Sequence, residues 1–162
     1  MSGCGWRALE LTSPRQHCDD GCMISYTDDL DGITAEQLRG FFVDWPNPPT
    51  PDTHLRLLRG SGAVEVAKDE TTGQVVGFIS GVTDGVLSAY IPLLEVLPAY
   101  QGKGIGSELV RRLLSRLDHL YTVDLLCDAD LQPFYEQQGM RPTVGMMSRR
   151  YARQSGAKPP QE

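Results

Sequence analysis

The chain has 162 residues, of which 40% are hydrophobic, 22% charged and 7% aromatic, and its formal net charge is −6. This length and apolar fraction suit one globular domain with its own core, and they exclude a disordered chain and a disulfide scaffold. The most apolar stretch, residues 89–100, is interrupted by two prolines and a glutamate, so we expect no membrane span. The acidic balance disfavours nucleic-acid binding, because the protein's field would repel the phosphate backbone.

Three of the four cysteines lie near the N-terminus, within residues 1–22. His17, Cys18 and Cys22 raise the question of zinc, but Cys-x3-Cys has no second well-spaced pair, so we predict no metal site. The start shows no cationic stretch followed by an apolar one, so we expect free thiols in a reducing cytoplasm. Cys127 ends an apolar run and is expected to be a small buried residue.

Hydrophobic periodicity and turn residues predict a series of strands and helices after residue 22. Helices are expected over residues 34–42, 52–59, 105–117 and 131–138, and strands over 23–26, 63–68, 74–82, 88–97, 123–127 and 144–151. Thr34 and Gln37 form a capping pair for the first helix, and four prolines between residues 46 and 51 end it. Pro92 predicts a bulge or a break within its strand.

This order of elements is typical of a mixed α/β sheet with helices on its faces. We predict a single domain over residues 23–152, preceded by a disordered tail over 1–22 and followed by a frayed end over 153–162. His54 and His119 are expected to be solvated and without a functional role.

The most informative stretch is residues 96–107, in which a strand leads into a glycine turn that opens directly into a helix. Glycines let a backbone approach a ligand closely, and the first N–H groups of a helix are unpaired, so this geometry suits a phosphate or diphosphate. A dinucleotide site would need a third glycine after Gly106, and a P-loop would need Ser or Thr after Lys103, where Gly104 stands. A tight turn without a ligand is the alternative.

Two motifs resemble those of the Gcn5-related N-acetyltransferases (GNAT). Residues 101–106, Gln-Gly-Lys-Gly-Ile-Gly, fit the family's Gln/Arg-x-x-Gly-x-Gly/Ala pattern and follow a strand that ends in Val-x-Pro. Residues 134–140, Phe-Tyr-Glu-Gln-Gln-Gly-Met, fit its second landmark with Met in place of the last aromatic residue. The resemblance covers about residues 23–151. One departure is Asp128, where the family often has Asn.

The resemblance implies an acyl-CoA N-acyltransferase fold, with a central mixed sheet of about six or seven strands and about four helices. It also implies direct transfer of the acetyl group of acetyl-CoA to an amine acceptor, a small molecule or a peptide, in a ternary complex. Acetyl-CoA would lie where two parallel strands splay apart. The implied cofactor-binding residues are Val96, Leu97, Gln101, Gly102, Lys103, Gly104, Ile105, Gly106 and Ser107. Homodimer formation is compatible with the sequence.

The implied reaction assigns roles to three side chains. An alkyl amine has a pKa near ~10, so a base must remove its proton, and Glu95 is our first candidate, ahead of Tyr90 and Asp84. Strand alternation places Glu95 opposite the Val96 side chain unless a bulge resets the phase. Tyr135 would hydrogen-bond or protonate the departing thiolate, and Trp45 would line the acceptor site. The alternative function is a CoA-binding sensor or regulatory domain without catalysis.

Overall fold

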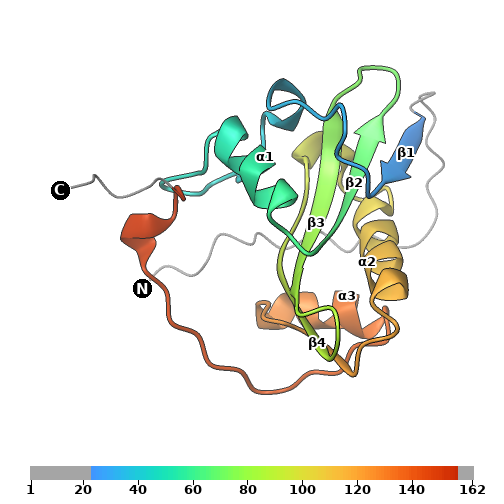
Figure 1. Cartoon of the computed structure of the whole chain (residues 1–162), viewed down its shortest axis with the longest axis vertical. Helices are drawn as coiled ribbons and strands as arrows, with labels where there is room; N and C mark the ends of the chain where they lie inside the picture. The colour runs from blue at the N-terminus through green and yellow to red at the C-terminus, as the bar shows by residue number, and fades with distance from the viewer. Residues whose placement is uncertain (1–22, 157–162) are drawn as a thin grey trace.

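The computed structural model describes residues 23–156, which fold around one sheet (Figure 1). Within these residues the sheet contains the strands β1 (Ile24–Thr27), β2 (Ala63–Asp69), β3 (Val75–Thr83), β4 (Ser88–Val96) and β5 (Thr122–Leu125). They lie side by side in sequence order; the first four are antiparallel, and β5 runs parallel to β4. The expected tail over 1–22 lies outside the described residues.

Helices cover both faces of this sheet. The α-helices are α1 (Pro51–Arg59), α2 (Ile105–Arg116) and α3 (Gln132–Glu136), and the 3₁₀ turns are η1 (Glu36–Leu38), η2 (Pro98–Tyr100), η3 (Ala129–Leu131) and η4 (Tyr151–Arg153). Two consecutive residues of β3 show how the faces divide. Gly77 lies against Ile105 and Leu109 of α2, whereas the ring of Phe78 packs on the opposite side against His54 of α1. The mixed α/β architecture is therefore confirmed.

The second helix, α1, forms almost as the sequence predicts. Thr50 caps its N-terminus by accepting a hydrogen bond from the Thr53 amide at 3.2 Å, and Pro51 occupies the first turn. The expectation for His54 was wrong: its side chain is only 1% exposed. It packs among the rings of Phe41, Phe42 and Phe78, which come from two segments distant in the sequence from α1 and from each other.

The first expected helix shrinks to the single turn η1. The predicted reach-back is present, because Gln37 Oε1 accepts from the Thr34 amide at 2.9 Å. The backbone then takes positive φ values at Gly40 (90°) and Phe42 (61°), which no α-helix can contain. The helix over 34–42 was therefore wrong beyond its first turn.

The last expected strand, 144–151, is not formed, so the sheet of six or seven strands was also wrong for the described residues. Residues 141–150, here called the C-terminal arm, have no regular structure, and Val144 and Met146 are each 98% exposed. In Figure 1 the arm curves away from the body before η4 returns toward α1. There, Arg56 Nη2 donates to the Gly156 carbonyl at 2.9 Å.

The bulge predicted at Pro92 is confirmed. The β3–β4 register shifts between Ser80, which pairs with Leu93, and Val82, which pairs with Tyr90. Between these two pairs β3 advances by two residues and β4 by three, so β4 carries one extra residue, as in a β-bulge. No helix in the described part of the chain is long and apolar enough to cross a membrane.

Candidate active site

Strand β5 pairs along its whole length with the first four residues of β4, and the two segments then separate. The pairing runs from Ser88 with Thr122 to Ile91 with Leu125, whereas β4 continues to Val96 with only β3 as a neighbour. This is the splay that the family resemblance implied. It leaves the β5-facing edge of β4 open from Pro92 onward.

The backbone of Val96 faces this open edge. The Leu97 amide donates to the Val76 carbonyl of the β3 segment at 2.8 Å, so Leu97 points its hydrogen-bonding groups toward β3. Groups alternate in direction along a strand, and the N–H and C=O of Val96 therefore point away from β3, into the splay. The Val96 carbonyl accepts from Gln101 Nε2 at 2.9 Å. A ligand in the splay could thus be met by the Val96 amide, whereas the Leu97 amide is already used.

The glycine turn leads from η2 into the N-terminus of α2. Gly102 and Gly104 have φ values of 74° and 80°, in the left-handed region that glycine favours, and a Cβ at either position would meet no atom within 4 Å. The first helical bond of α2 runs from the Glu108 amide to the Gly104 carbonyl at 3.1 Å. The amides of residues 105–107 precede it and have no acceptor within the helix.

These features fit a diphosphate. The turn offers open space on the glycine side, unpaired amides at a helix N-terminus and the positive end of the α2 dipole. Lys103 is exposed, and its ammonium lies 5.1 Å from the centre of the Tyr100 ring. No group of His, Cys, Asp and Glu residues within the described chain could hold a metal ion.

The predicted acid, Tyr135, lies on α3 beside the start of α2. The ring of its neighbour Phe134 lies 3.7 Å from the Cβ position of Gly106 and packs edge-on against Tyr135, with centroids 4.9 Å apart. Burial, and to a lesser degree the Cys127 thiolate, raises the pKa of the Tyr135 phenol far above its ordinary value of 10. Tyr135 is therefore a hydrogen-bond donor throughout the physiological pH range.

The predicted base, Glu95, makes contacts that sequence reasoning missed. Its carboxylate accepts from the backbone amides of Phe42 at 2.9 Å and Val43 at 3.2 Å. These bonds hold a loop in which Phe42 and Asp44 have positive φ values of 61° and 63°, unusual for residues other than glycine. Burial raises the pKa of Glu95, and the two amide bonds oppose this rise.

The same loop carries Trp45, the predicted acceptor-site residue. The Trp45 amide donates to the Phe42 carbonyl at 3.2 Å, and the two rings pack with centroids 5.1 Å apart. Glu95 and Trp45 therefore belong to one unit, on the face of the sheet that α1 covers. No residue pattern signals this arrangement, because the carboxylate and the amides are more than fifty positions apart.

Asp84, an alternative base, has a structural role instead. Its carboxylate accepts from the amides of Val86 and Leu87 at 2.8 Å each and from Ser88 at 3.1 Å, which closes the β3–β4 turn. These bonds, led by that from Leu87, lower the pKa of Asp84 well below its ordinary range. The carboxylate is thus a turn cap and a weak base.

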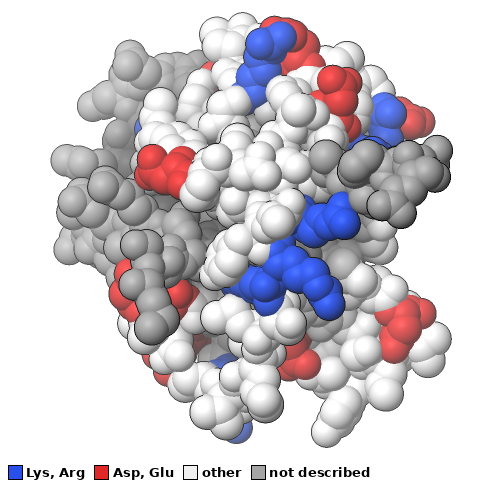
Figure 2. Space-filling model, turned by 90° about the vertical axis from the view of Figure 1, so that its left-hand side faces the viewer, with Lys and Arg blue, Asp and Glu red and all other residues white. Residues whose placement is uncertain are grey.

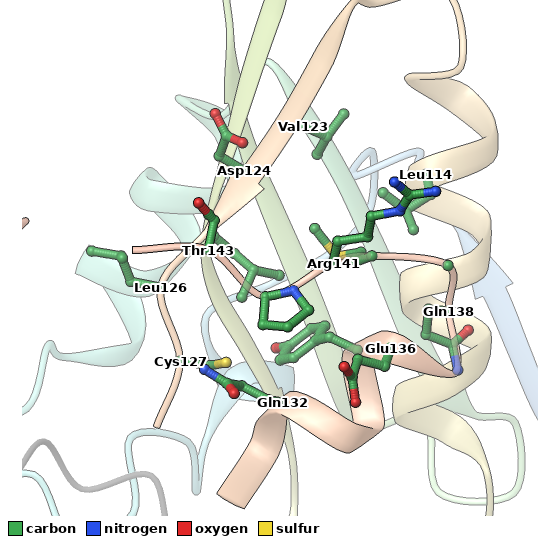
Figure 3. A pocket seen from close by; sticks show the side chains of 15 residues that line it. Leu114, Val123, Asp124, Leu126, Cys127, Gln132, Glu136, Gln138, Arg141 and Thr143 are labelled. Carbon is green, nitrogen blue, oxygen red and sulfur yellow. The ribbon is translucent and has the colours of Figure 1, made fainter. Parts of the chain in front are cut away.

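A pocket of about 380 Å³ is bordered by β5, α2, α3 and the start of the C-terminal arm (Figure 3). Val123 of β5, Leu114 of α2 and Arg141 of the arm are among its lining residues. Of the predicted site residues, Tyr135 lines this pocket, whereas the glycine turn and Val96 do not. The pocket therefore adjoins the candidate active site without containing its anion-binding part.

Comparisons with known proteins agree with this geometry. The family model described as acetyltransferase (GNAT) family matches residues 30–140. One similar crystal structure is that of a Deinococcus radiodurans R1 protein assigned to the acetyltransferases, whose sequence is 44% identical to this one. The match covers 91% of this chain and 99% of that protein, with a TM-score of 0.81. The uncharacterized N-acetyltransferase ycf52 of Porphyra purpurea is 25% identical over 119 residues, which are 72% of this chain and 68% of that protein.

A more distant structure shares the fold. It is the aminoglycoside N-acetyltransferase AAC(6')-Iy in complex with CoA, which is 15% identical and covers 86% of this chain and 98% of its own, with a TM-score of 0.60. The family model covers more than half of the present sequence, and it includes the splayed strands, the glycine turn and Tyr135. The chain belongs to the GNAT family of acetyltransferases.

Proposed function

We propose that this protein transfers the acetyl group of acetyl-CoA directly to an amine acceptor, with both substrates bound together. The observation that carries the proposal is the open splay between β4 and β5, bordered by the Val96 amide and by the unpaired amides at the start of α2. One site thus offers hydrogen-bonding groups to an extended amide-containing chain and to a diphosphate. Acetyl-CoA has both parts, and its thioester supplies the activated acetyl group.

The anion-binding role falls to the glycine turn. The amides of residues 105–107 would hold the diphosphate, with Lys103 adding a positive charge. The Gln101 side chain, which donates to the Val96 carbonyl, lies between this turn and the strand edge. In the proposed complex a ligand amide takes the position of the Gln101 amide on Val96.

The Val96 amide is the donor for the developing oxyanion, because it faces the splay and is preorganised by the strand. Tyr135 donates a hydrogen bond to the departing sulfur. The reference pKa values, ~10 for Tyr and ~8.5 for a thiol, already make full proton transfer uphill by about 2 kcal/mol. Burial raises the pKa of Tyr135 further, so hydrogen bonding is the larger part of its role.

Glu95 accepts the amine proton, directly or through water. Its pKa is raised by burial, toward the pH at which general bases work best. Trp45, fixed to the same loop by Phe42, lines the path of the acceptor. We place the reaction in the cytoplasm, and the net charge of −6 favours a cationic acceptor over an anionic one.

One observation favours the second candidate, a CoA-binding sensor without catalysis. Both oxygens of the Glu95 carboxylate already accept backbone hydrogen bonds, which weakens it as a base. The two functions share the cofactor and differ in turnover.

A thermal-shift titration with acetyl-CoA, followed by a thiol-release screen over amine classes, tests both functions. We expect a concentration-dependent rise in Tm and thiol release with at least one amine. A Tm unchanged by millimolar acetyl-CoA would refute both functions. A rise in Tm without turnover on any amine class would favour the sensor.

A further inference from the structure

Tyr100, the last residue of η2, ties the start of the glycine turn to a distant part of the sheet. Its hydroxyl donates to Asp69 Oδ2 at 2.8 Å, and Asp69 ends β2, 31 positions earlier in the chain. The Tyr100 amide donates to the Leu97 carbonyl at 2.8 Å. The next residue, Gln101, is anchored separately on β4 by its bond to the Val96 carbonyl. The segment that leads into the glycine turn is thus held at two points.

Asp69 is a buried anchor for the Tyr100 hydroxyl. Its side chain belongs to a residue that is only 3% exposed, and a buried carboxylate is unfavourable unless it is hydrogen-bonded. Asp69 Oδ1 accepts from the Thr71 amide at 2.8 Å, and the Asp69 carbonyl accepts from the Gly73 amide at 2.7 Å. These bonds fix the carboxylate within the β2–β3 hairpin. The Tyr100 ring is therefore oriented by an acceptor that is itself held in place.

The face of the Tyr100 ring lies beside Lys103, the residue between the two glycines of the turn. The Lys103 ammonium is 5.1 Å from the ring centre, and a cation is attracted to an aromatic face within about 6 Å. This ring contact places the end of a long, exposed side chain next to the turn. The position of the ammonium therefore depends on the orientation of the ring.

The charge of Lys103 is not neutralised by a carboxylate of the described chain. Arg111, Arg112 and Arg116 of α2 all form ion pairs with acidic side chains, whereas Lys103 forms none within residues 23–156. Figure 2 shows the commoner situation at the upper margin of one face, where basic side chains lie beside acidic ones. The Lys103 charge is thus left available to an anion at the turn.

Holding the ammonium before a ligand arrives lowers the cost of binding. A free lysine side chain loses rotamer entropy when it is fixed against an anion, and a side chain that is already placed loses less. The contacts that place it run from the hairpin through Asp69 and Tyr100 to Lys103.

We propose that Tyr100 is a positioning residue for the anion site: anchored by Asp69, its ring keeps the Lys103 ammonium beside the glycine turn for the diphosphate of acetyl-CoA. This inference rests on the proposed function. It extends the site to the β2–β3 hairpin, which lies outside both family motifs. Because Tyr100 acts only through a phosphate-binding cation, it should improve binding of acetyl-CoA but not of S-acetylpantetheine, which has the thioester and the amides but no phosphate.

Isothermal titration calorimetry with CoA tests the link between Tyr100 and Lys103. Tyr100→Leu should weaken CoA binding by about three- to tenfold, because both the ring contact and the preplacement of the ammonium are lost. In a Lys103→Ala background the same substitution should change affinity by less than about 1.5-fold, since its partner is already absent. Fully additive losses would overturn the proposal. Tyr100→Phe keeps the ring without its bond to Asp69, and CoA affinity equal to that of the wild type would refute the anchoring role of Asp69.

Tyr26→Leu is the matched control. The ring of Tyr26 on β1 also lies under a cation, with Arg112 Cζ 4.7 Å from the ring centre, but that cation is paired with Glu108. This variant should leave CoA affinity unchanged. Equal losses in Tyr26→Leu and Tyr100→Leu would mean that removing either ring acts through stability, and would overturn the proposal.

Steady-state kinetics with two acetyl donors distinguish positioning from a general structural role. Tyr100→Leu should raise KM for acetyl-CoA with little change in kcat, and should leave both constants for S-acetylpantetheine unchanged. Similar losses with both donors would make Tyr100 a residue of the fold alone, against the proposal.

Nuclear magnetic resonance of the ligand-free protein tests the positioning independently of the proposed function. The ring current of Tyr100 should shift the ε-methylene protons of Lys103 upfield, and Tyr100→Leu should remove this shift. Unshifted Lys103 protons in the wild type would refute the positioning. Failure of the wild type to bind CoA, with the upfield shift present, would instead refute the proposed function and with it the diphosphate as the ligand of Lys103.

Discussion

Replacing Gly104 with Asp tests the anion site most directly. Gly104 has a φ of 80°, and no atom lies within 4 Å of the position that its Cβ would take. The stability cost is therefore that of the left-handed backbone, about 1–2 kcal/mol, with no steric contribution. For a chain of this size that corresponds to a fall in Tm of about 2–8 °C. The fold should survive.

The effect on ligand binding should be much larger. The new carboxylate would stand in the space where we place a diphosphate, and two unit charges about 4 Å apart repel by about 4 kcal/mol at an effective dielectric constant near 20. Even half of that energy weakens binding by more than tenfold, and the full value by several hundredfold. Isothermal titration calorimetry with CoA measures this loss.

Gly85→Asp is the control. Gly85 has a φ of 72° and is equally open, but it lies in the β3–β4 turn. It should lower Tm by a similar amount and leave CoA affinity unchanged. If Gly104→Asp bound CoA as tightly as the wild type, or if both variants lost affinity equally, the glycine turn would not be the diphosphate site.

Three further substitutions separate catalysis from stability. Glu95→Gln should reduce kcat by about 10²–10⁴-fold, because it removes the proposed base. The wild-type activity should rise as pH increases through the raised pKa of Glu95, and the variant should lack this rise. If pH–activity profiles of the variant kept the rise, Glu95 would only position its loop. Tyr135→Phe keeps the ring that packs on Phe134 but removes the hydroxyl, so it should lower kcat. CoA affinity measured by calorimetry should stay within about threefold of the wild-type value. Unchanged turnover would show that Tyr135 takes no part in the reaction. Burial lowers the pKa of His54 from 6.5 to about 4, against a smaller opposite effect of the Leu38 backbone. As pH falls, His54 takes up its proton at a higher pH in the unfolded chain than in the folded one. His54 should therefore lower the free energy of unfolding by up to about 3 kcal/mol between pH 6.5 and pH 4. In urea unfolding, His54→Leu should lack this pH dependence; if the variant kept it, another group would be its cause.

Features set by neighbouring residues could be predicted from the sequence. The Thr34–Gln37 pair, the amphipathic helix α2, the glycine turn and the bulge at Pro92 all depend on residues only a few positions apart. Each has a local physical cause, such as a missing N–H or a side chain that satisfies an amide. The motifs that identify the family are local in the same sense.

Features set by distant partners could not be predicted. The burial of His54 depends on rings from two other segments, and the positive φ of Phe42 is held by a carboxylate on β4. The arm has the composition of a strand, but a strand also needs an edge to pair with. Composition alone does not determine whether such an edge lies within reach.

Pro92 connects the sequence signal to the opening of the site. Without its bulge and its proline, β4 could continue to pair with β5 beyond Ile91. Beyond the bulge, the N–H groups of residues 94 and 96 point away from β3, on the side of β5, and Pro92, which lies within the bulge, has no N–H to donate. The ladder to β5 therefore ends at Ile91, the strands separate, and the Val96 amide is left facing open space. The residue that weakens the sheet is thus the one that exposes the strand edge on which the proposed reaction depends.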